Sequence, residues 1–174
     1  MGVAVIVHGF IECPGWADHQ LMGPVDRHNK AVIAALPKTD DDRPSVTRAM
    51  FTVLPPKGVE PYYGTQLITF AASYKNMYRL ESKWIAKFEA LLRKLCWMRA
   101  TVFLEFGALR YDWEVESKHL RERCFANPPQ PPTEWSFNCS RLDAKSIPAA
   151  EAIDQSYEPN PPSDEAPFDP PACS

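Results

Sequence analysis

The chain has 174 residues, of which 45% are hydrophobic, enough to bury one core of ordinary size but not the cores of two full domains. Its formal charge of -3 at pH 7 gives no sequence-wide electrostatic reason for nucleic-acid binding. The charge is uneven, since residues 1–124 carry 17 Lys and Arg against 14 Asp and Glu, whereas residues 125–174 carry 2 against 8.

The cysteines and the N-terminal segment indicate where the protein works. Five cysteines are present, none of them in a CxxC or CxC pair, and an odd number does not suit a fully paired disulfide framework. The opening MGVAVIVHGF has no basic region ahead of its apolar run, which is too short for a signal peptide or a membrane span. We therefore expect a cytoplasmic protein that does not enter a membrane.

Four segments of the first half predict regular structure. Residues 2–12 are β-branched and apolar at both odd and even positions, which is typical of a strand buried on both faces. Residues 26–36 place apolar side chains at helical spacing behind Asp26, a suitable N-cap, and predict a short helix. Residues 45–54, closed by two prolines, and residues 65–74 are rich in strand-forming residues.

The strongest pattern is an amphipathic helix over residues 80–95. Its apolar stripe repeats at helical spacing, and its opposite side is mostly basic. The stripe comprises Leu80, Trp84, Phe88, Leu91, Leu92 and Leu95. From residue 100 the period changes to two, which predicts a hairpin of residues 100–106 and 108–116 around Gly107.

The order of these elements is β-α-β-β-α-β-β, and it predicts an α+β domain over residues 1–124. We expect a ferredoxin-like arrangement with one extra strand, in which a mixed or antiparallel sheet carries two helices on one face. The charged side of residues 108–116 is expected to face solvent at the edge of this sheet.

The segment 125–174 carries 11 of the 18 prolines together with acidic residues, so we expect an extended tail without a core of its own. Trp135 and Phe137 interrupt this composition and suggest that the tail is partly docked on the body. Two helices can cover only one face of the sheet, and the apolar strands require a cover for the other. The tail, a different protein or a second copy in a homodimer could supply it.

The stretch HGFIECPGWADHQ concentrates residues that bind metals or act as nucleophiles. His8, Cys13, His19 and His28 are the ligands that a metal would use, but their spacing matches no HxH, CxxC or HExxH pattern. The simpler interpretation is a polar strand end for His8, a small buried side chain for Cys13 and a solvated His19. We expect no cofactor.

Catalytic motifs are also missing from the sequence. It contains no GxxxxGK[ST] or GxGxxG loop for phosphates and no GxSxG elbow for a serine nucleophile. Glu105 lies in the apolar run VFLEF, where burial could raise its pKa, although strand alternation explains its position equally well. We therefore expect a protein without enzymatic activity.

The function that remains is binding another protein, as small bacterial immunity or adaptor proteins do. An exposed edge at residues 108–116 would pair with a partner strand. The anchors would be aromatic, namely Tyr62, Tyr111, Trp113, Trp135 and Phe137. The alternative is a small enzyme or ligand binder with a pocket near His8, Cys13 and Glu105. A single-stranded RNA binder is the third reading, but the RNP1 pattern is missing, so we expect no nucleic-acid partner.

Overall fold

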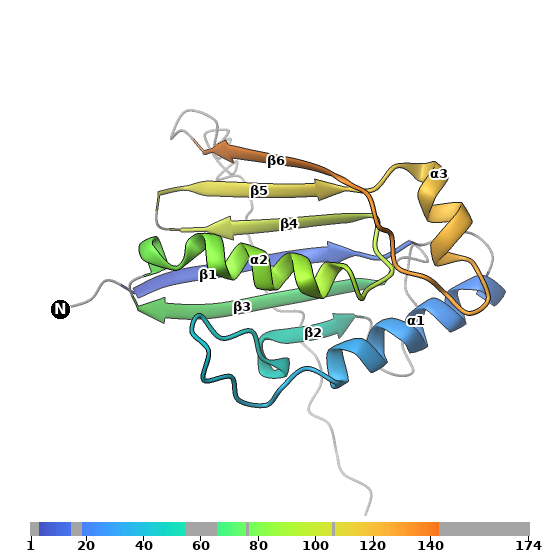
Figure 1. Cartoon of the computed structure of the whole chain (residues 1–174), viewed down its shortest axis with the longest axis horizontal. Helices are drawn as coiled ribbons and strands as arrows, with labels where there is room; N and C mark the ends of the chain where they lie inside the picture. The colour runs from blue at the N-terminus through green and yellow to red at the C-terminus, as the bar shows by residue number, and fades with distance from the viewer. Residues whose placement is uncertain (1–3, 15–18, 55–65, 76, 106, 143–174) are drawn as a thin grey trace, which may run out of the picture. The chain divides into compact units, whose positions relative to one another are not determined.

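The computed structural model describes residues 4–14, 19–54, 66–75, 77–105 and 107–142 (Figure 1). The chain divides into two compact units, residues 1–142 and residues 143–174. The second unit lies outside the described residues.

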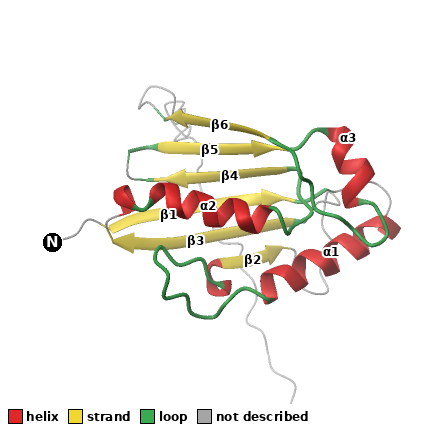
Figure 2. Cartoon of the chain, in the orientation of Figure 1, coloured by secondary structure: helices red, strands yellow, loops and turns green. Residues whose placement is uncertain are grey.

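The described unit is an α+β structure built on one six-stranded antiparallel sheet with three helices (Figure 2). The strands lie in the order β2-β3-β1-β4-β5-β6, and every neighbouring pair is antiparallel. The elements are β1 (Ala4–Glu12), α1 (His19–Ala34), β2 (Phe51–Leu54), β3 (Leu67–Lys75), α2 (Glu81–Leu92), β4 (Arg99–Leu104), β5 (Leu109–Glu114), α3 (Ser117–His119) and β6 (Ser136–Arg141). The α+β prediction is confirmed, and the sheet is antiparallel rather than mixed.

β1 lies inside the sheet, between β3 and β4. Its residues Val5, Val7 and Ile11 are buried on the face that carries the core. Gly9 lies on the same face, where a Cβ atom would collide with the carbonyl oxygen of Thr101 and stand 2.8 Å from the ring of Phe70. Only glycine lets the neighbouring strand and the Phe70 ring approach this closely.

α2 covers the core face of the sheet, as Figure 2 shows. The apolar stripe forms as predicted, since Trp84, Phe88, Leu91, Leu92 and Leu95 are all buried and Leu80 is half-buried. The Phe88 ring lies 5.1 Å from the Trp84 ring and 5.3 Å from the Trp113 ring of β5, measured between centroids. These contacts join the helix to the sheet through a continuous aromatic core.

Two predicted boundaries are wrong in the first half of the chain. α1 begins at His19 rather than near Asp26, because Pro24 is accommodated inside the helix. The strand expected over residues 45–54 is shorter, since β2 begins only at Phe51 and a 3₁₀ turn over Arg48–Met50 precedes it. β2 therefore pairs with β3 only as far as Phe70, and residues 71–75 of β3 extend beyond it.

The predicted edge at residues 108–116 is also wrong. β5 pairs with β4 on one side and with β6 on the other, so it lies inside the sheet. After β5 the chain passes through α3 and a turn of π-helix over Leu120–Cys124, then returns along the sheet. Trp135 packs 5.6 Å from Trp97 just before β6 starts. Part of the proline-rich segment thus adds a strand to the sheet.

No described helix is long and apolar enough to cross a membrane.

Candidate binding surfaces

The sheet has a second face, opposite the one that α2 covers, and we call it the open face. Alternate residues of β3, β1, β4 and β5 point to it, because neighbouring side chains of a strand point in opposite directions. Ile6, Phe10 and Phe103 form its apolar centre together with the ring of His8. Ile6 is 41% exposed, and the three rings are half-buried.

His8, Phe103 and Arg110 form a row across three strands. The register places His8 opposite Phe103 and Phe103 opposite Arg110. The His8 and Phe103 rings are stacked with centroids 5.2 Å apart, and the Arg110 guanidinium carbon lies 5.7 Å from the Phe103 centroid. Stacking of this kind fixes the rings while leaving part of their area accessible.

Ion pairs lie next to this apolar centre. Arg110 Nε is 2.7 Å from Asp112 Oδ2, and the Thr101 hydroxyl donates a hydrogen bond of 2.8 Å to the same carboxylate. Arg99 and Glu114 approach to 3.4 Å one row further along the strands. An apolar centre with a charged rim is the composition of many protein interfaces.

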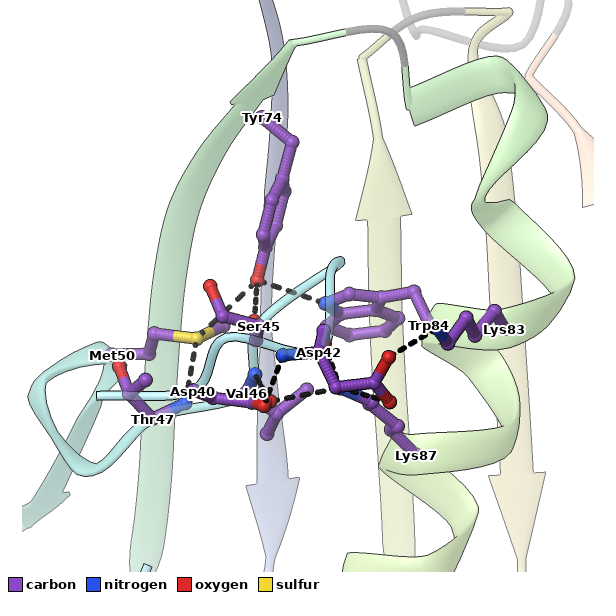
Figure 3. Close-up of polar contacts among 10 residues, drawn as sticks. All are labelled: Asp40, Asp42, Ser45, Val46, Thr47, Met50, Tyr74, Lys83, Trp84 and Lys87. Atoms are coloured by element: carbon purple, nitrogen blue, oxygen red, sulfur yellow. Dashed lines mark hydrogen bonds and ion pairs between the residues drawn. The ribbon is translucent and has the colours of Figure 1, made fainter. Parts of the chain in front are cut away.

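A second surface is built by the loop that precedes β2, and its contacts are drawn in Figure 3. Asp40 binds the Lys87 ammonium at 2.8 Å and accepts a hydrogen bond of 3.1 Å from the Val46 backbone N–H. Asp42 binds Lys83 at 2.5 Å. Hydrogen bonding to Lys87 holds the pKa of Asp40 below its usual value, and Lys83 does the same for Asp42. The loop is thereby tied to α2.

Tyr74 of β3 ties the same loop to the sheet. Its hydroxyl donates a hydrogen bond of 2.5 Å to the Ser45 carbonyl and accepts one of 3.0 Å from the Trp84 indole N–H (Figure 3). Burial raises the pKa of Tyr74, so its proton is retained for the bond to Ser45.

A pocket of about 440 Å³ lies between this loop and the end of β3, and we call it the β3 pocket. Its polar lining consists of Arg43, Ser45, Thr47, Ser73, Tyr74 and Lys75. Its described lining contains two cations and four hydroxyl groups but no carboxylate. No sequence pattern predicts this pocket, because Arg43 and Lys75 are 32 positions apart and line one pocket only when the loop is held against β3.

A second hollow, of about 450 Å³, lies where β5 leads into α3. Glu114, Glu116, Glu134, His119 and Trp135 are among its lining residues. Glu134 approaches His119 to 3.8 Å, and the Arg93 guanidinium lies 5.1 Å from the Trp135 ring centroid. Trp135, one of the predicted anchors, therefore already has a cation on its ring.

The remaining predicted anchors lie in different environments. Tyr111 and Trp113 are buried on the core face, where Trp113 donates a hydrogen bond of 3.0 Å to Glu89 and Tyr111 binds Glu81. Burial raises the pKa of Tyr111. Phe137 is 50% exposed, stacks with the Tyr111 ring and lies tilted against the Trp113 ring. Tyr62 lies outside the described residues. As built, Tyr111 and Trp113 are parts of the core rather than of an accessible surface.

The four predicted metal ligands do not converge. His8 lies on the open face, whereas Cys13 is fully buried and accepts a hydrogen bond of 3.2 Å from Asn29. His28 Nε2 lies 2.8 Å from the Lys94 carbonyl oxygen, and His19 starts α1 with a side chain outside the described part. Within the described ranges, no group of three or more His, Cys, Asp or Glu could hold a metal ion.

The pocket expected near His8, Cys13 and Glu105 does not form from these residues. Glu105 follows β4 and its backbone N–H donates to the carbonyl of Ile6, so it lies near His8. Cys13 follows the last residue of β1 and lies five residues from His8, about 17 Å away at 3.3 Å per residue. Burial strongly raises the pKa of Cys13, which keeps this thiol protonated and unreactive.

No protein-family model, no curated protein and no solved structure matches this chain.

Proposed function

We propose that this protein is a non-enzymatic binding protein whose open face receives another protein. The observation that carries the proposal is the accessible centre of Ile6, Phe10 and Phe103, stacked with His8, on the sheet face opposite α2. Aromatic and aliphatic anchors surrounded by a polar rim supply most of the binding energy in protein interfaces.

The charges of the open face favour a protein over a nucleic acid. Its arginines, Arg99 and Arg110, are already paired with carboxylates of the same face. Lys75 also belongs to this face, but Glu12 and Glu105 outnumber it. Single-stranded nucleic acids require an electropositive groove along the backbone, which these paired charges do not provide.

Binding is also favoured over catalysis. A nucleophilic cysteine must be deprotonated and accessible, whereas Cys13 is buried with a raised pKa. His8 stacks on Phe103, and a stacked ring on an open sheet face suits recognition better than proton transfer in a closed site.

We further infer a ferredoxin-like unit in the first four strands with α1 and α2. The first four strands lie in the order β2-β3-β1-β4. α1 connects β1 to β2, and β3 lies between these two strands. α2 connects β3 to β4, and β1 lies between those two. β5 and β6 extend this unit. The four described cysteines are free, which supports a cytoplasmic protein of the immunity or adaptor type.

The proposal is tested by photo-cross-linking in cells of the source organism. A benzophenone amino acid replaces Phe103 on the open face, and the matched control carries it at Phe137, an exposed aromatic position beside the Tyr111 ring of the core face. We expect one protein adduct from position 103 that disappears when Ile6→Glu is added.

Three outcomes would contradict the proposal. They are no protein adduct from position 103, the same adducts from positions 103 and 137, and an adduct to RNA alone. An adduct between two copies of the chain would support it and identify the partner as a second copy. Melting temperatures of the purified variants within a few degrees of the wild type would show that Ile6→Glu acts on binding.

A further inference from the structure

We propose that the β3 pocket binds the phosphate group of a small ligand. The pocket adjoins the open face, since Ser73 pairs with Ile6 in the sheet register, but the proposal does not depend on the proposed function. It rests on the unbalanced charge of the pocket, on its hydroxyl groups and on the contacts that hold its wall in place.

No ion pair joins either cation of the pocket to a carboxylate in the described part of the chain. Within the described residues, neither Arg43 nor Lys75 forms an ion pair, whereas Lys83, Lys87, Arg99 and Arg110 all do. No carboxylate is among the described lining residues, although Asp40, which is paired with Lys87, lies close enough to act on Tyr74. An anion entering the pocket would therefore meet two positive charges without breaking an ion pair of Arg43 or Lys75 among the described residues.

The pocket is positively charged because the loop directs its carboxylates to α2 and its arginine to the pocket. Asp40 and Asp42 are bound to the lysines of α2, so their negative charge is neutralised on that side (Figure 3). Arg43, the next residue in the chain, lines the pocket instead. A guanidinium can bind two phosphate oxygens at once, and an ammonium contributes a compact positive charge.

The hydroxyl groups divide into two kinds. The Tyr74 hydroxyl already donates to the Ser45 carbonyl and accepts from Trp84, so Tyr74 positions the wall rather than the ligand. The hydroxyls of Ser45, Thr47 and Ser73 remain as donors for phosphate oxygens.

The pocket is also held in shape before any ligand binds. Asp40 accepts a hydrogen bond from the Val46 N–H, and Arg48 donates its backbone N–H to the Pro37 carbonyl at 3.0 Å. A preformed site loses less conformational entropy on binding. A volume of about 440 Å³ falls within the range for small-molecule sites and admits a phosphate with a small organic substituent.

The test is an NMR titration of the full-length, ¹⁵N-labelled protein with inorganic phosphate at constant ionic strength. We expect saturable shifts at the amides of Thr47 and Ser73, with a dissociation constant on the order of 1 mM. Arg43→Gln and Lys75→Gln should each weaken binding about tenfold, the loss expected for one charge-assisted hydrogen bond.

The matched control is Lys94→Gln. Lys94 lies just beyond the C-terminal end of α2, whereas Leu80 of the pocket lining lies at its N-terminal end. This variant should change the dissociation constant less than about twofold, because salt screens charges beyond about 10 Å. Equal losses in Lys94→Gln and Lys75→Gln, or shifts that do not saturate, would overturn the proposal. Unchanged amide spectra elsewhere in the variants would show that the fold is intact.

A second titration identifies the source of the phosphate. Glycerol phosphate or a nucleoside monophosphate that binds at least tenfold more tightly than inorganic phosphate would identify a phosphorylated small molecule. Equal affinities would identify free phosphate. Because the open face is tested by cross-linking at position 103, either proposal can fail without the other.

Discussion

The two faces of the sheet are made by the same strands and carry different chemistry. On the core face, Trp84, Phe88 and Trp113 are fully buried, and each indole N–H has a hydrogen-bond acceptor. On the open face, the rings of His8 and Phe103 are only half-buried and lie beside ion pairs. The comparison suggests that one face supplies stability and the other recognition, since alternation along a strand lets each face vary independently.

The largest effect should follow from removing an aromatic ring on the core face. Phe88→Ala should lower the free energy of unfolding by about 3–5 kcal/mol, because it leaves a cavity among rings that cannot move to fill it. Urea denaturation followed by tryptophan fluorescence measures this loss.

The matched change on the open face is Phe103→Ala. It should cost about 1 kcal/mol or less, because a half-buried ring leaves no closed cavity. Similar losses of unfolding free energy in Phe88→Ala and Phe103→Ala would contradict the assignment of stability to one face and recognition to the other.

An intermediate effect is expected at Asn29, which joins α1 to the ends of the strands. Its amide donates to the Cys96 carbonyl at 2.8 Å and accepts from the Cys96 N–H at 2.8 Å, and its side chain is fully buried. Asn29→Ala leaves both backbone groups without these partners and should cost about 2–3 kcal/mol in the same assay. A loss of unfolding free energy as small as that of Phe103→Ala would show that other groups form hydrogen bonds with the N–H and the carbonyl of Cys96.

The smallest effect concerns pH and the loop. The pKa of Asp40 is lowered in the folded state by its hydrogen bond to Lys87, so this stabilisation is complete above the unfolded pKa of about 4 and is lost as the pH falls through the folded pKa. The difference in unfolding midpoint between the wild type and Asp40→Asn should therefore be constant at neutral pH and disappear in acid. A difference that persists in acid would rule out the carboxylate as its source.

The elements with a clear period could be predicted from the sequence. The predictions over residues 2–12, 65–74 and 80–95 match β1 (Ala4–Glu12), β3 (Leu67–Lys75) and α2 (Glu81–Leu92), because apolar side chains recur at the period of each element. β6 could not be predicted in this way. Its sequence SFNCSR is polar and follows several prolines, and only its pairing with β5 makes it a strand.

The binding surfaces were harder to predict than the fold. Their aromatic character predicts that Tyr111 and Trp113 are anchors, whereas the charged side of residues 108–116 predicts that the opposite side faces the core. The second prediction holds, since Trp113 is buried against Phe88 of α2. The β3 pocket depends on Asp40, Asp42 and Tyr74 holding a loop in place. Such contacts join distant residues and leave no periodic pattern.

The position of β1 has a consequence for how the chain folds. The N-terminal strand pairs with residues 67–75 on one side and with residues 99–104 on the other. Both contacts close long loops, so their entropic cost is incurred before the sheet gains any stability. We therefore expect folding on the millisecond-to-second scale of sheet proteins rather than the microseconds of helical bundles. During synthesis, β1 leaves the ribosome long before β4, the strand that becomes its second neighbour.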